Sequence, residues 1–392
     1  MSEVFQNLRH LRVLLAVADL NSVTLASEVC HVSQPAVTQT INKLERALGH
    51  PIFERSRLGF SPTTHGELLI HRTRRAFELL DAALNRVAPR LRITATRSQL
   101  QALIHVRDCE NFTIAAKRLG MSQPALSRAV SHLEQDGETV LFVRRPHGLV
   151  ATPECQHLAR AARLAFAEFE QAESELGEFE NREVGRIVIG ALPMARSFAL
   201  PEALLAFRRH RPTLPVTVID GTYLDLLGGL RRGDIDMIVG ALREPAPIDD
   251  VVERFLCHDR MVFVAGQQHP LAGAAAPSLE QLAGYPWVVP RKTTASRAGF
   301  DRLFHEAGLT PRSILEAGSV LFMRQLLEQS DHLGCISYRQ AKAEIDRGGL
   351  RVLDVPVQWE ERNFGVTLRR DWMPTSSQKL LLDLLAEVTA AL

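Results

Sequence analysis

The chain has 392 residues, 46% of them hydrophobic and 23% charged, which is typical of a globular protein with two to four domains. It contains no apolar run of the roughly 18 residues that a membrane helix needs. It also shows no secretory leader, so we expect a cytoplasmic protein. The net charge of +1 hides an asymmetry, because residues 1–152 carry 19 basic and 13 acidic residues and the remainder carries 27 and 32. The basic N-terminal part is compatible with binding a polyanion.

The sequence carries no motif for catalysis or for a metal. The five cysteines, at 30, 109, 155, 257 and 335, are scattered and form no CxxC pair, which favours free thiols over disulfides or a zinc site. GxSxG, HExxH and P-loop lysine motifs are also missing from the sequence. We therefore expect no catalytic residue, no metal and no cofactor, and the sequence does not favour an enzyme.

One segment of the N-terminal part occurs twice. "SQPAVTQTINKLE" at 33–45 returns as "SQPALSRAVSHLE" at 122–134, 89 residues later. The same offset relates Leu14 to Leu103 and Phe53 to Phe142, and no gap is needed from about 11 to 63. A repeat of this length indicates one structural unit used twice.

The pattern of the first copy predicts three helices followed by a hairpin. Two short stretches with apolar residues at helical spacing precede a longer one, which Ser33 can cap and which Gly49 ends. Pro35 falls in the first turn, where its missing N–H costs little. "IFERSRLGFSPT" then has the pattern of a short β-hairpin. Three helices and a hairpin make a winged helix-turn-helix.

The third helix of each copy has a polar face opposite its apolar stripe. Side chains of this kind reach base edges in a major groove, while an arginine in each wing can meet a phosphate. Geometrically, Gln39 favours adenine and Arg128 favours guanine. The alternative is a three-helix module whose polar face meets only solvent. The predicted DNA-binding residues are Ser33, Gln34, Pro35, Thr38, Gln39, Asn42, Lys43 and Arg55, with Ser122, Gln123, Pro124, Ser127, Arg128, Ser131, His132 and Arg144.

At these residues the sequence resembles a known family. "LASEVCHVSQPAVTQTINKLERALGHPIFERS" and "IAAKRLGMSQPALSRAVSHLEQDGETVLFVRR" both resemble the DNA-binding head of LysR-type transcriptional regulators. The resemblance implies that residues 33–35, 38 and 39, and their counterparts in the second copy, face the major groove. Two departures are that Gly49 is matched by Glu138 and Gly66 by Cys155. A larger departure is the second head, because a family member normally has one.

Each head is followed by a stretch with an apolar stripe at helical spacing. The stretch after the second head has a heptad seam, and the resemblance implies a linker helix that pairs between two subunits. Such pairing would give a homodimer or homotetramer, with four heads in each pair of chains. The alternative is a helix that packs on its own chain. The predicted dimerisation residues are Leu158, Ala162, Ala165, Phe169, Ala172, Leu176 and Phe179.

From Gly185 onward, strand and helix patterns alternate at the spacing of a parallel α/β sheet. "LRRGDIDMIVGAL" and "HPLAG" resemble the effector domain of the same family, which is similar to periplasmic binding proteins. The resemblance implies two lobes with a ligand between them. We expect lobe I at 185–242 and 362–392, and lobe II at 243–361.

Ligands of such sheets bind at the carboxyl ends of strands, near helix N-termini. Hydroxyl and N–H groups there can hold a small anionic or polyhydroxylated molecule. For each residue alone, a helix cap or a turn is an equally good interpretation. The predicted effector-binding residues are Pro193, Met194, Arg196, Ser197, Gly221, Thr222, Gly240, Thr294, Ser296 and Arg297, together with Thr293.

The patterns and the family resemblance together imply a two-lobed α/β effector domain, similar to periplasmic binding proteins, preceded by two α-rich winged helix-turn-helix domains and long linker helices. The expected partners are double-stranded DNA and a small-molecule effector of unknown identity, and RNA polymerase is a further candidate. A second hypothesis is a cytoplasmic metabolite-binding protein whose helix-turn-helix repeats bind other proteins. The expected domains are a first head at 1–66, a linker helix and connector at 67–97, a second head at 98–155, a dimerisation helix at 156–184 and the effector-binding domain at 185–392.

Overall fold

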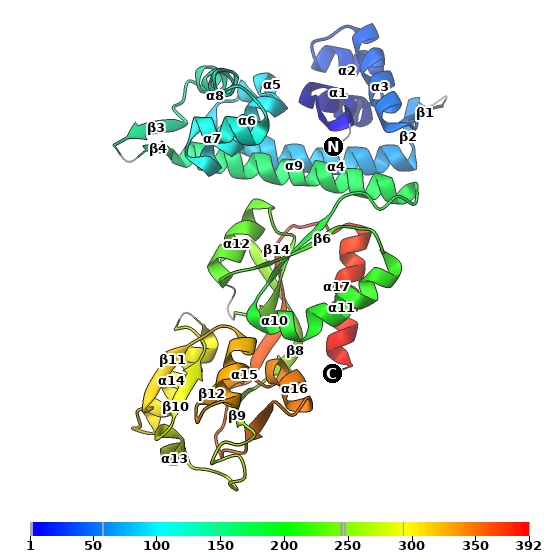
Figure 1. Cartoon of the computed structure of the whole chain (residues 1–392). Coiled ribbons are helices and arrows are strands. Elements are labelled where there is room, and N and C mark those ends of the chain that lie inside the picture. Colours follow the sequence, from blue (N-terminus) through cyan, green and yellow to red (C-terminus); the bar gives the residue numbers. More distant parts are fainter. Residues whose placement is uncertain are drawn as a thin grey trace. The chain divides into compact units, whose positions relative to one another are not determined.

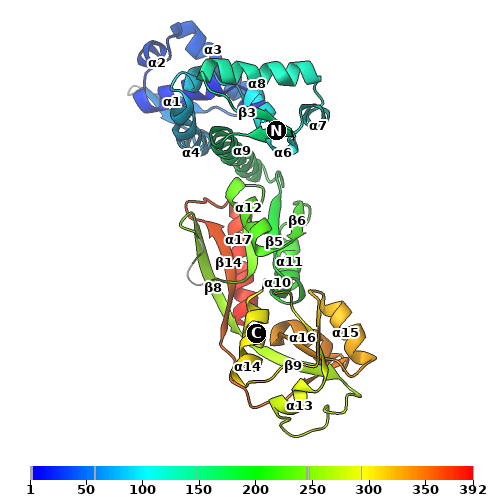
Figure 2. The same ribbon diagram turned by 90° about the vertical axis from the view of Figure 1, so that its left-hand side faces the viewer.

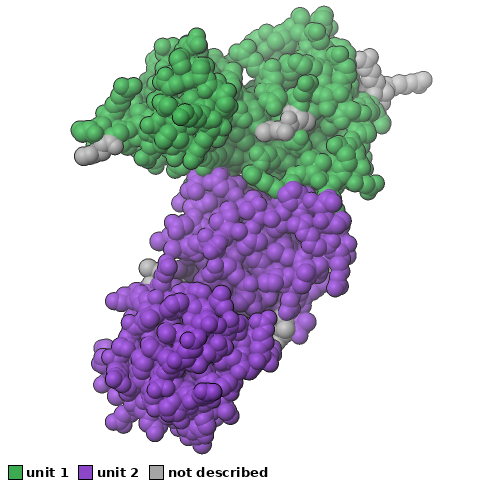
Figure 3. Space-filling view, in the orientation of Figure 1, with its two compact units in different colours: residues 1–186 green, residues 187–392 purple. Residues whose placement is uncertain are grey.

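The computed structural model describes residues 3–56, 59–146, 148–243, 246, 248–292 and 294–391. The chain divides into two compact units, residues 1–186 and 187–392 (Figure 3). Among the described residues, no helix is both long enough and apolar enough to cross a membrane.

Unit 1 contains the predicted repeat as two modules of three helices and a hairpin (Figure 1). A short 3₁₀ turn, η1 (Glu3–Phe5), precedes the first module, and a short helix, α5 (Leu91–Thr94), precedes the second. The first module comprises α1 (Leu8–Leu20), α2 (Val23–Val29), α3 (Gln34–Leu48), β1 (Phe53–Ser56) and β2 (Gly59–Pro62). The second comprises α6 (Arg97–Cys109), α7 (Phe112–Leu119), α8 (Gln123–Gly137), β3 (Phe142–Arg145) and β4 (Gly148–Ala151).

The two modules end their third helices in the same way although the residues differ. Gly49 ends α3 with φ of 82°, and its counterpart Glu138 ends α8 with φ of 46°. Both lie in the left-handed region, which glycine adopts freely and other residues only at some cost. The substitution at 138 therefore keeps the chain reversal at the end of the helix.

A long helix follows each module, and these two helices pack along each other. They are α4 (Thr64–Val87) and α9 (Pro153–Phe179). The start of α4 meets the end of α9, where the His65 and Phe179 rings lie 5.0 Å apart. Farther along α4, Phe77 lies against Phe169, with ring centroids 6.4 Å apart. The helices are thus antiparallel.

This packing corrects the predicted partner of the heptad seam. We expected the seam of α9 to pair with a second subunit, but α4 of the same chain covers it. The stripe of α4 has the same spacing, and its tether within the chain gives it a high effective concentration. The seam residues Leu158, Ala162, Ala165, Phe169, Ala172 and Leu176 are buried within the chain, whereas Phe179 is 47% exposed.

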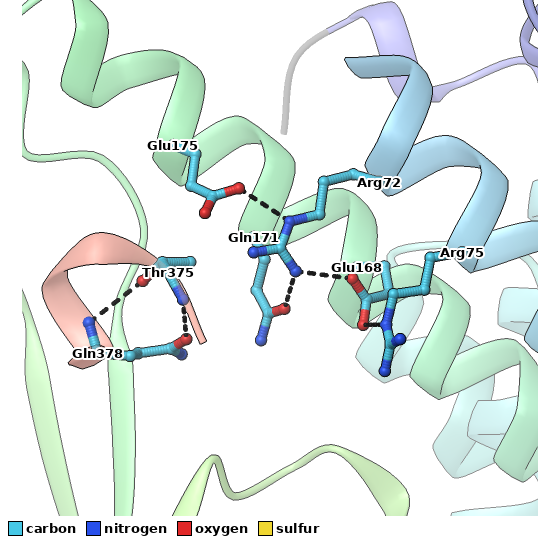
Figure 4. A network of polar contacts seen from close by, with 7 residues as sticks. All are labelled: Arg72, Arg75, Glu168, Gln171, Glu175, Thr375 and Gln378. Carbon is cyan, nitrogen blue, oxygen red and sulfur yellow. Dashed lines mark hydrogen bonds and ion pairs between the residues drawn. The ribbon is translucent and has the colours of Figure 1, made fainter. Parts of the chain in front are cut away.

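A buried polar network fixes the register of the two helices. Arg72 on α4 is 2% exposed and donates to Glu168 and Glu175, both at 2.8 Å, and to Gln171 at 2.9 Å (Figure 4). Arg75 donates to the other oxygen of Glu168 at 2.9 Å. Burial lowers the pKa of Arg72, but the hydrogen bonds and charges of Glu175 and Glu168 outweigh burial and raise it. Arg72 therefore stays charged in an apolar seam.

Unit 2 contains two five-stranded mixed sheets (Figure 2). In each sheet three strands are parallel and two more are antiparallel to their neighbours, which refines the parallel sheet that we expected. The first sheet, in the order β6-β5-β7-β14-β8, comprises β5 (Ile187–Ala191), β6 (Val216–Asp220), β7 (Met237–Ala241), β8 (Val251–Asp259) and β14 (Arg362–Arg369). The second, in the order β11-β10-β12-β9-β13, comprises β9 (Met261–Gly266), β10 (Pro286–Val289), β11 (Ser313–Glu316), β12 (Leu333–Ser337) and β13 (Leu350–Leu353).

Helices cover these sheets and bury apolar clusters against them. In the second sheet the core is aromatic, with the rings of Phe263, Trp287 and Phe300 in mutual contact. The helices are α10 (Pro193–Ser197), α11 (Ala199–His210), α12 (Tyr223–Arg232) and α17 (Ser376–Ala390) with the first sheet, and α13 (Leu279–Ala283), α14 (Ala295–Glu306), α15 (Val320–Glu328) and α16 (Tyr338–Asp346) with the second.

The boundary between the lobes differs from the one that we predicted. We placed residues 243–361 in lobe II, but β8 pairs with β14 over its whole length and belongs to the first sheet. The chain passes between the sheets at Arg260 and returns at Arg362. The pattern of β8 does not show which sheet a strand joins, because antiparallel pairing with a strand about a hundred residues later leaves no local signal.

The Arg72 network yields a stability prediction. Arg72→Ala leaves Glu175 without its cation and leaves Glu168 with Arg75 alone, so we expect a loss of about 3–5 kcal/mol in the free energy of unfolding. The matched control is Arg74→Ala on the same helix, which removes an exposed ion pair with Asp19 and should cost less than about 1 kcal/mol. Urea denaturation of both variants measures the difference, and equal losses would show that the network does not hold the seam.

Candidate nucleic-acid interface and effector cleft

The first recognition helix, α3, has one buried face and one open face. Ser33 caps it by accepting a hydrogen bond from the Ala36 N–H at 3.4 Å, and Pro35 lies in the first turn. Val37, Ile41 and Leu44 are buried against the rest of the module. On the open face Ser33, Gln34, Pro35, Gln39, Asn42 and Lys43 are exposed and Thr38 is half-buried.

The second recognition helix, α8, repeats this arrangement. Ser122 caps it through the Ala125 N–H at 3.3 Å, and Leu126, Val130 and Leu133 form the buried stripe. The two faces therefore match in geometry but differ in chemistry, because α8 presents a guanidinium where α3 presents an amide. On the open face Ser122, Gln123, Pro124, Arg128 and His132 are exposed, and Ser127 and Ser131 are half-buried.

One carboxylate ties each recognition helix to the wing that follows it. Glu45 Oε1 accepts from the N–H groups of Ile52 and Phe53, at 2.8 and 3.4 Å. In the second module Glu134 Oε1 accepts from the N–H groups of Leu141 and Phe142, at 2.8 and 3.2 Å. These hydrogen bonds fix the wing relative to the helix, and sequence analysis did not single out either glutamate. Arg144 is exposed on β3, whereas the side chain of Arg55 on β1 lies outside the described residues.

The predicted effector-binding residues of lobe I gather at the carboxyl ends of three parallel strands. Arg196 of α10 donates to Asp220 at the end of β6 at 3.0 Å, which brings these two segments together. Gly240 at the end of β7 adopts φ of 154°, and a Cβ there would lie 2.4 Å from Leu192, so only glycine fits. Gly221 and Thr222 follow β6, and the Thr222 hydroxyl caps α12 through the Asp225 N–H at 3.3 Å.

The predicted residues of lobe II lie at the start of α14. Thr294 caps this helix, the role that we set against ligand binding, and Thr293 lies outside the described residues. Arg297 is 4% exposed and donates to Asp301 and Glu316, both at 2.7 Å. Two carboxylates already neutralise Arg297, so its charge is paired within lobe II.

Hydrogen bonds from Ser337 and Arg362 link the lobes of unit 2. The Ser337 hydroxyl donates to the sulfur of Met194 at 3.4 Å. Arg362 reaches across from the start of β14 and donates to the hydroxyl of Ser296 and to the sulfur of Met261. Burial lowers the pKa of Arg362, while Asp259 acts in the opposite direction. Met194 and Ser296, predicted separately, thus each lie at an interlobe contact, and the contact of Ser296 is made by an arginine that sequence analysis missed.

Comparison with known proteins identifies the family. The family profile described as "Bacterial regulatory helix-turn-helix protein, lysR family" matches residues 8–67 and again residues 98–164. The "LysR substrate binding domain" profile matches residues 180–390. The chain belongs to the LysR family of DNA-binding transcriptional regulators. This assignment confirms the predicted family, the fold class and the general function of a regulator with an effector-binding domain.

Relatives of the LysR chain include regulators that match it along its whole length. The HTH-type transcriptional regulator GalR of Pseudomonas putida is 31% identical over 388 residues, 97% of this chain and 97% of that protein. PcaQ of Agrobacterium fabrum is 24% identical over 385 residues, 98% of this chain and 95% of that protein.

Solved structures share the LysR fold. Full-length OxyR from Pseudomonas aeruginosa is 20% identical, with a TM-score of 0.54, and the match covers 74% of this chain and 97% of that one. Full-length CbnR in a complex with its target DNA is 19% identical, with a TM-score of 0.52, and the match covers 75% and 99% of the two chains. These identities are low, so they support the fold alone.

The interlobe region of the LysR effector domain also contains a cavity of about 500 Å³. Ser197 lines it, but its other walls come from residues that sequence analysis missed, including His258, Arg260 and Arg339. Asp259 also lines it and is 5% exposed, and its Oδ2 is buried with no hydrogen-bond partner in the described part of the chain. These residues lie where the chain crosses between sheets, which strand patterns alone do not mark.

The wing anchors yield a local prediction. Glu134→Ala leaves the N–H groups of Leu141 and Phe142 without their acceptor, and we expect the second wing to lose about 1–3 kcal/mol of local stability. Hydrogen exchange followed by mass spectrometry should then show faster exchange in peptides from residues 139–152, with little change in residues 50–63. Glu45→Ala is the matched control and should give the reverse pattern. Uniform loss of protection across both wings would contradict separate anchors.

Proposed function

We propose that the chain binds double-stranded DNA through both recognition helices, α3 and α8, and regulates transcription in response to a small-molecule effector held between the lobes of unit 2. The main support is that both predicted polar faces are open while the opposite faces are buried. A major groove admits a helix with this division of faces. Because the chromosome is the target, we propose that the protein acts in the cytoplasm.

The contacts divide by chemistry. Lys43 and Arg144 supply exposed cations for backbone phosphates, which position the heads without reading sequence. Gln39 and Asn42 on α3 suit adenine, and Arg128 on α8 suits the O6 and N7 atoms of guanine. Ser33 and Ser122 mark the N-termini of α3 and α8, which would face the DNA. The positive end of each helix dipole lies there and favours a phosphate. The two heads should thus prefer different half-sites.

The effector part of the proposal rests on the interlobe contacts. Arg362 and Ser296 supply hydrogen-bond donors for an anionic or polyhydroxylated molecule, and the buried Oδ2 of Asp259 lacks a donor in the described chain. A ligand that satisfies these groups in one lobe arrangement stabilises that arrangement over others. Differential affinity of this kind is what a regulatory switch needs.

A gel-shift experiment tests DNA binding directly. We expect the full chain to retard duplex DNA from upstream of its own coding region at low salt. Affinity should fall at least about tenfold between 50 and 200 mM salt, because Lys and Arg contacts release counterions. If no duplex is retarded at low salt, with or without added metabolites, the alternative of a metabolite-binding protein whose heads bind other proteins is favoured.

Selection of bound sequences from random duplexes tests the two reading faces. We expect Gln39→Ala and Arg128→Ala to relax the selected motif at different positions, each by about 1–3 kcal/mol at its own base pair. Both residues are exposed, so neither substitution should unfold the protein. If both variants relax the same position, the heads do not read DNA separately.

A further inference from the structure

The repeat in the structure is longer than the one that the sequence motif marks. The offset of 89 residues that relates the heads also relates α4 to α9, since Leu69 corresponds to Leu158 and Ala76 to Ala165. All four of these side chains are buried in the seam between the two helices. The duplicated unit is thus a head together with the long helix that follows it, and each copy pairs with the other.

The contacts between α4 and α9 are those of a pseudo-twofold axis. Arg72 contacts Gln171 and Arg75 contacts Glu168. A shift of three residues toward the C-terminus of α4 therefore corresponds to a shift of three residues toward the N-terminus of α9. Continuing this register to the middle of the pair brings Phe77 opposite Phe166, and these two residues are repeat counterparts. A half-turn about this point places the residues of α4 on their counterparts in α9.

Each head forms the same ion pair with its own long helix. Asp19 of α1 pairs with Arg74 of α4, and their counterparts Asp108 of α6 and Arg163 of α9 also pair. In both Figure 1 and Figure 2 the two heads lie on the same side of the α4–α9 pair. The symmetry of the helix pair is therefore carried over to the heads.

The buried network breaks this symmetry and selects the partner. The counterpart of Arg72 is Ala161, and the counterparts of Glu168 and Glu175 are Leu79 and Arg86. If α9 paired with α9 of another chain, Glu168 and Glu175 would enter the seam without Arg72. If α4 paired with α4, Arg72 would enter it without a carboxylate. Both arrangements leave buried charges unpaired, which is strongly unfavourable.

We propose that one chain is a complete two-headed DNA-binding unit, in which α3 and α8 occupy two inverted half-sites of the same duplex at the same time. This inference rests on the proposed function, since it requires that both heads bind DNA. The pseudo-twofold axis makes the half-sites inverted. The difference between Gln39 and Arg128 makes them unlike, so the chain binds its site in one direction only.

A complementation experiment with the full-length chain tests whether both heads must belong to one chain. Gln39→Glu disables the first head and Arg128→Glu disables the second, because each places a carboxylate at the exposed face that meets the polyanion. The two variants are coexpressed with different tags, so that any assembly of chains can contain both. The duplex carries the two selected half-sites at their selected spacing.

If one chain must supply both heads, the mixture binds no more tightly than either variant alone. The mixture and each single variant should all bind about a hundredfold more weakly than the unaltered chain. The unaltered chain has a tethered second head, which binds at high effective concentration once the first head is bound. If the mixture regains the affinity and the two-half-site footprint of the unaltered chain, the heads act from separate chains and the inference is overturned.

Changing the DNA instead of the protein gives an independent measurement. Inserting five base pairs between the half-sites rotates one by about half a helical turn. We expect the unaltered chain to lose about a hundredfold in affinity, because the α4–α9 pair holds the heads in one relation. Affinity that is unchanged by the insertion would overturn the inference. Failure to bind any duplex at low salt would instead remove the proposed function itself.

Discussion

The burial of one apolar seam between α4 and α9 is the constraint on which unit 1 depends. Each helix alone would expose a stripe of leucine, alanine and phenylalanine, and each covers the stripe of the other. A seam of this kind is not selective, since any helix with the same spacing fits it. Arg72 makes it selective, because its guanidinium is satisfied only where Glu168, Gln171 and Glu175 face it. Packing supplies the attraction, and the polar network determines the partner and the register.

The two copies have kept some features and lost others, and the difference follows the physical role of each residue. Both retain the serine cap, the glutamate that holds the wing and the ion pair between head and long helix. These contacts fix geometry. The groups that face outward have changed, as Gln39 and Arg128 show. The two copies therefore have closely similar scaffolds, but their exposed recognition faces differ in chemistry.

Much of this architecture could be predicted from the sequence, because the decisive signals are local. The serine caps, the proline in the first helical turn and the apolar stripes define α3 and α8. What could not be predicted was pairing over distance. The stripe of α9 looks the same whether its partner is α4 or a second chain, and the strand pattern of β8 does not reveal pairing with β14. Arg362 was missed for the same reason, since its partner Ser296 is 66 residues earlier in the chain.

The 89-residue offset could have predicted that α4 pairs with α9. Once α4 and α9 are aligned at 89 residues, the seam positions coincide, but Arg72 aligns with alanine and Glu168 with leucine. A charge in an apolar stripe is costly unless an opposite charge reaches it. Arg72 on one stripe and two glutamates on the other are therefore complementary defects, each tolerable only against the other. That complementarity favours pairing of α4 with α9 over pairing of like helices. It also explains how a duplicated head can form a symmetric scaffold without requiring a second copy of the chain.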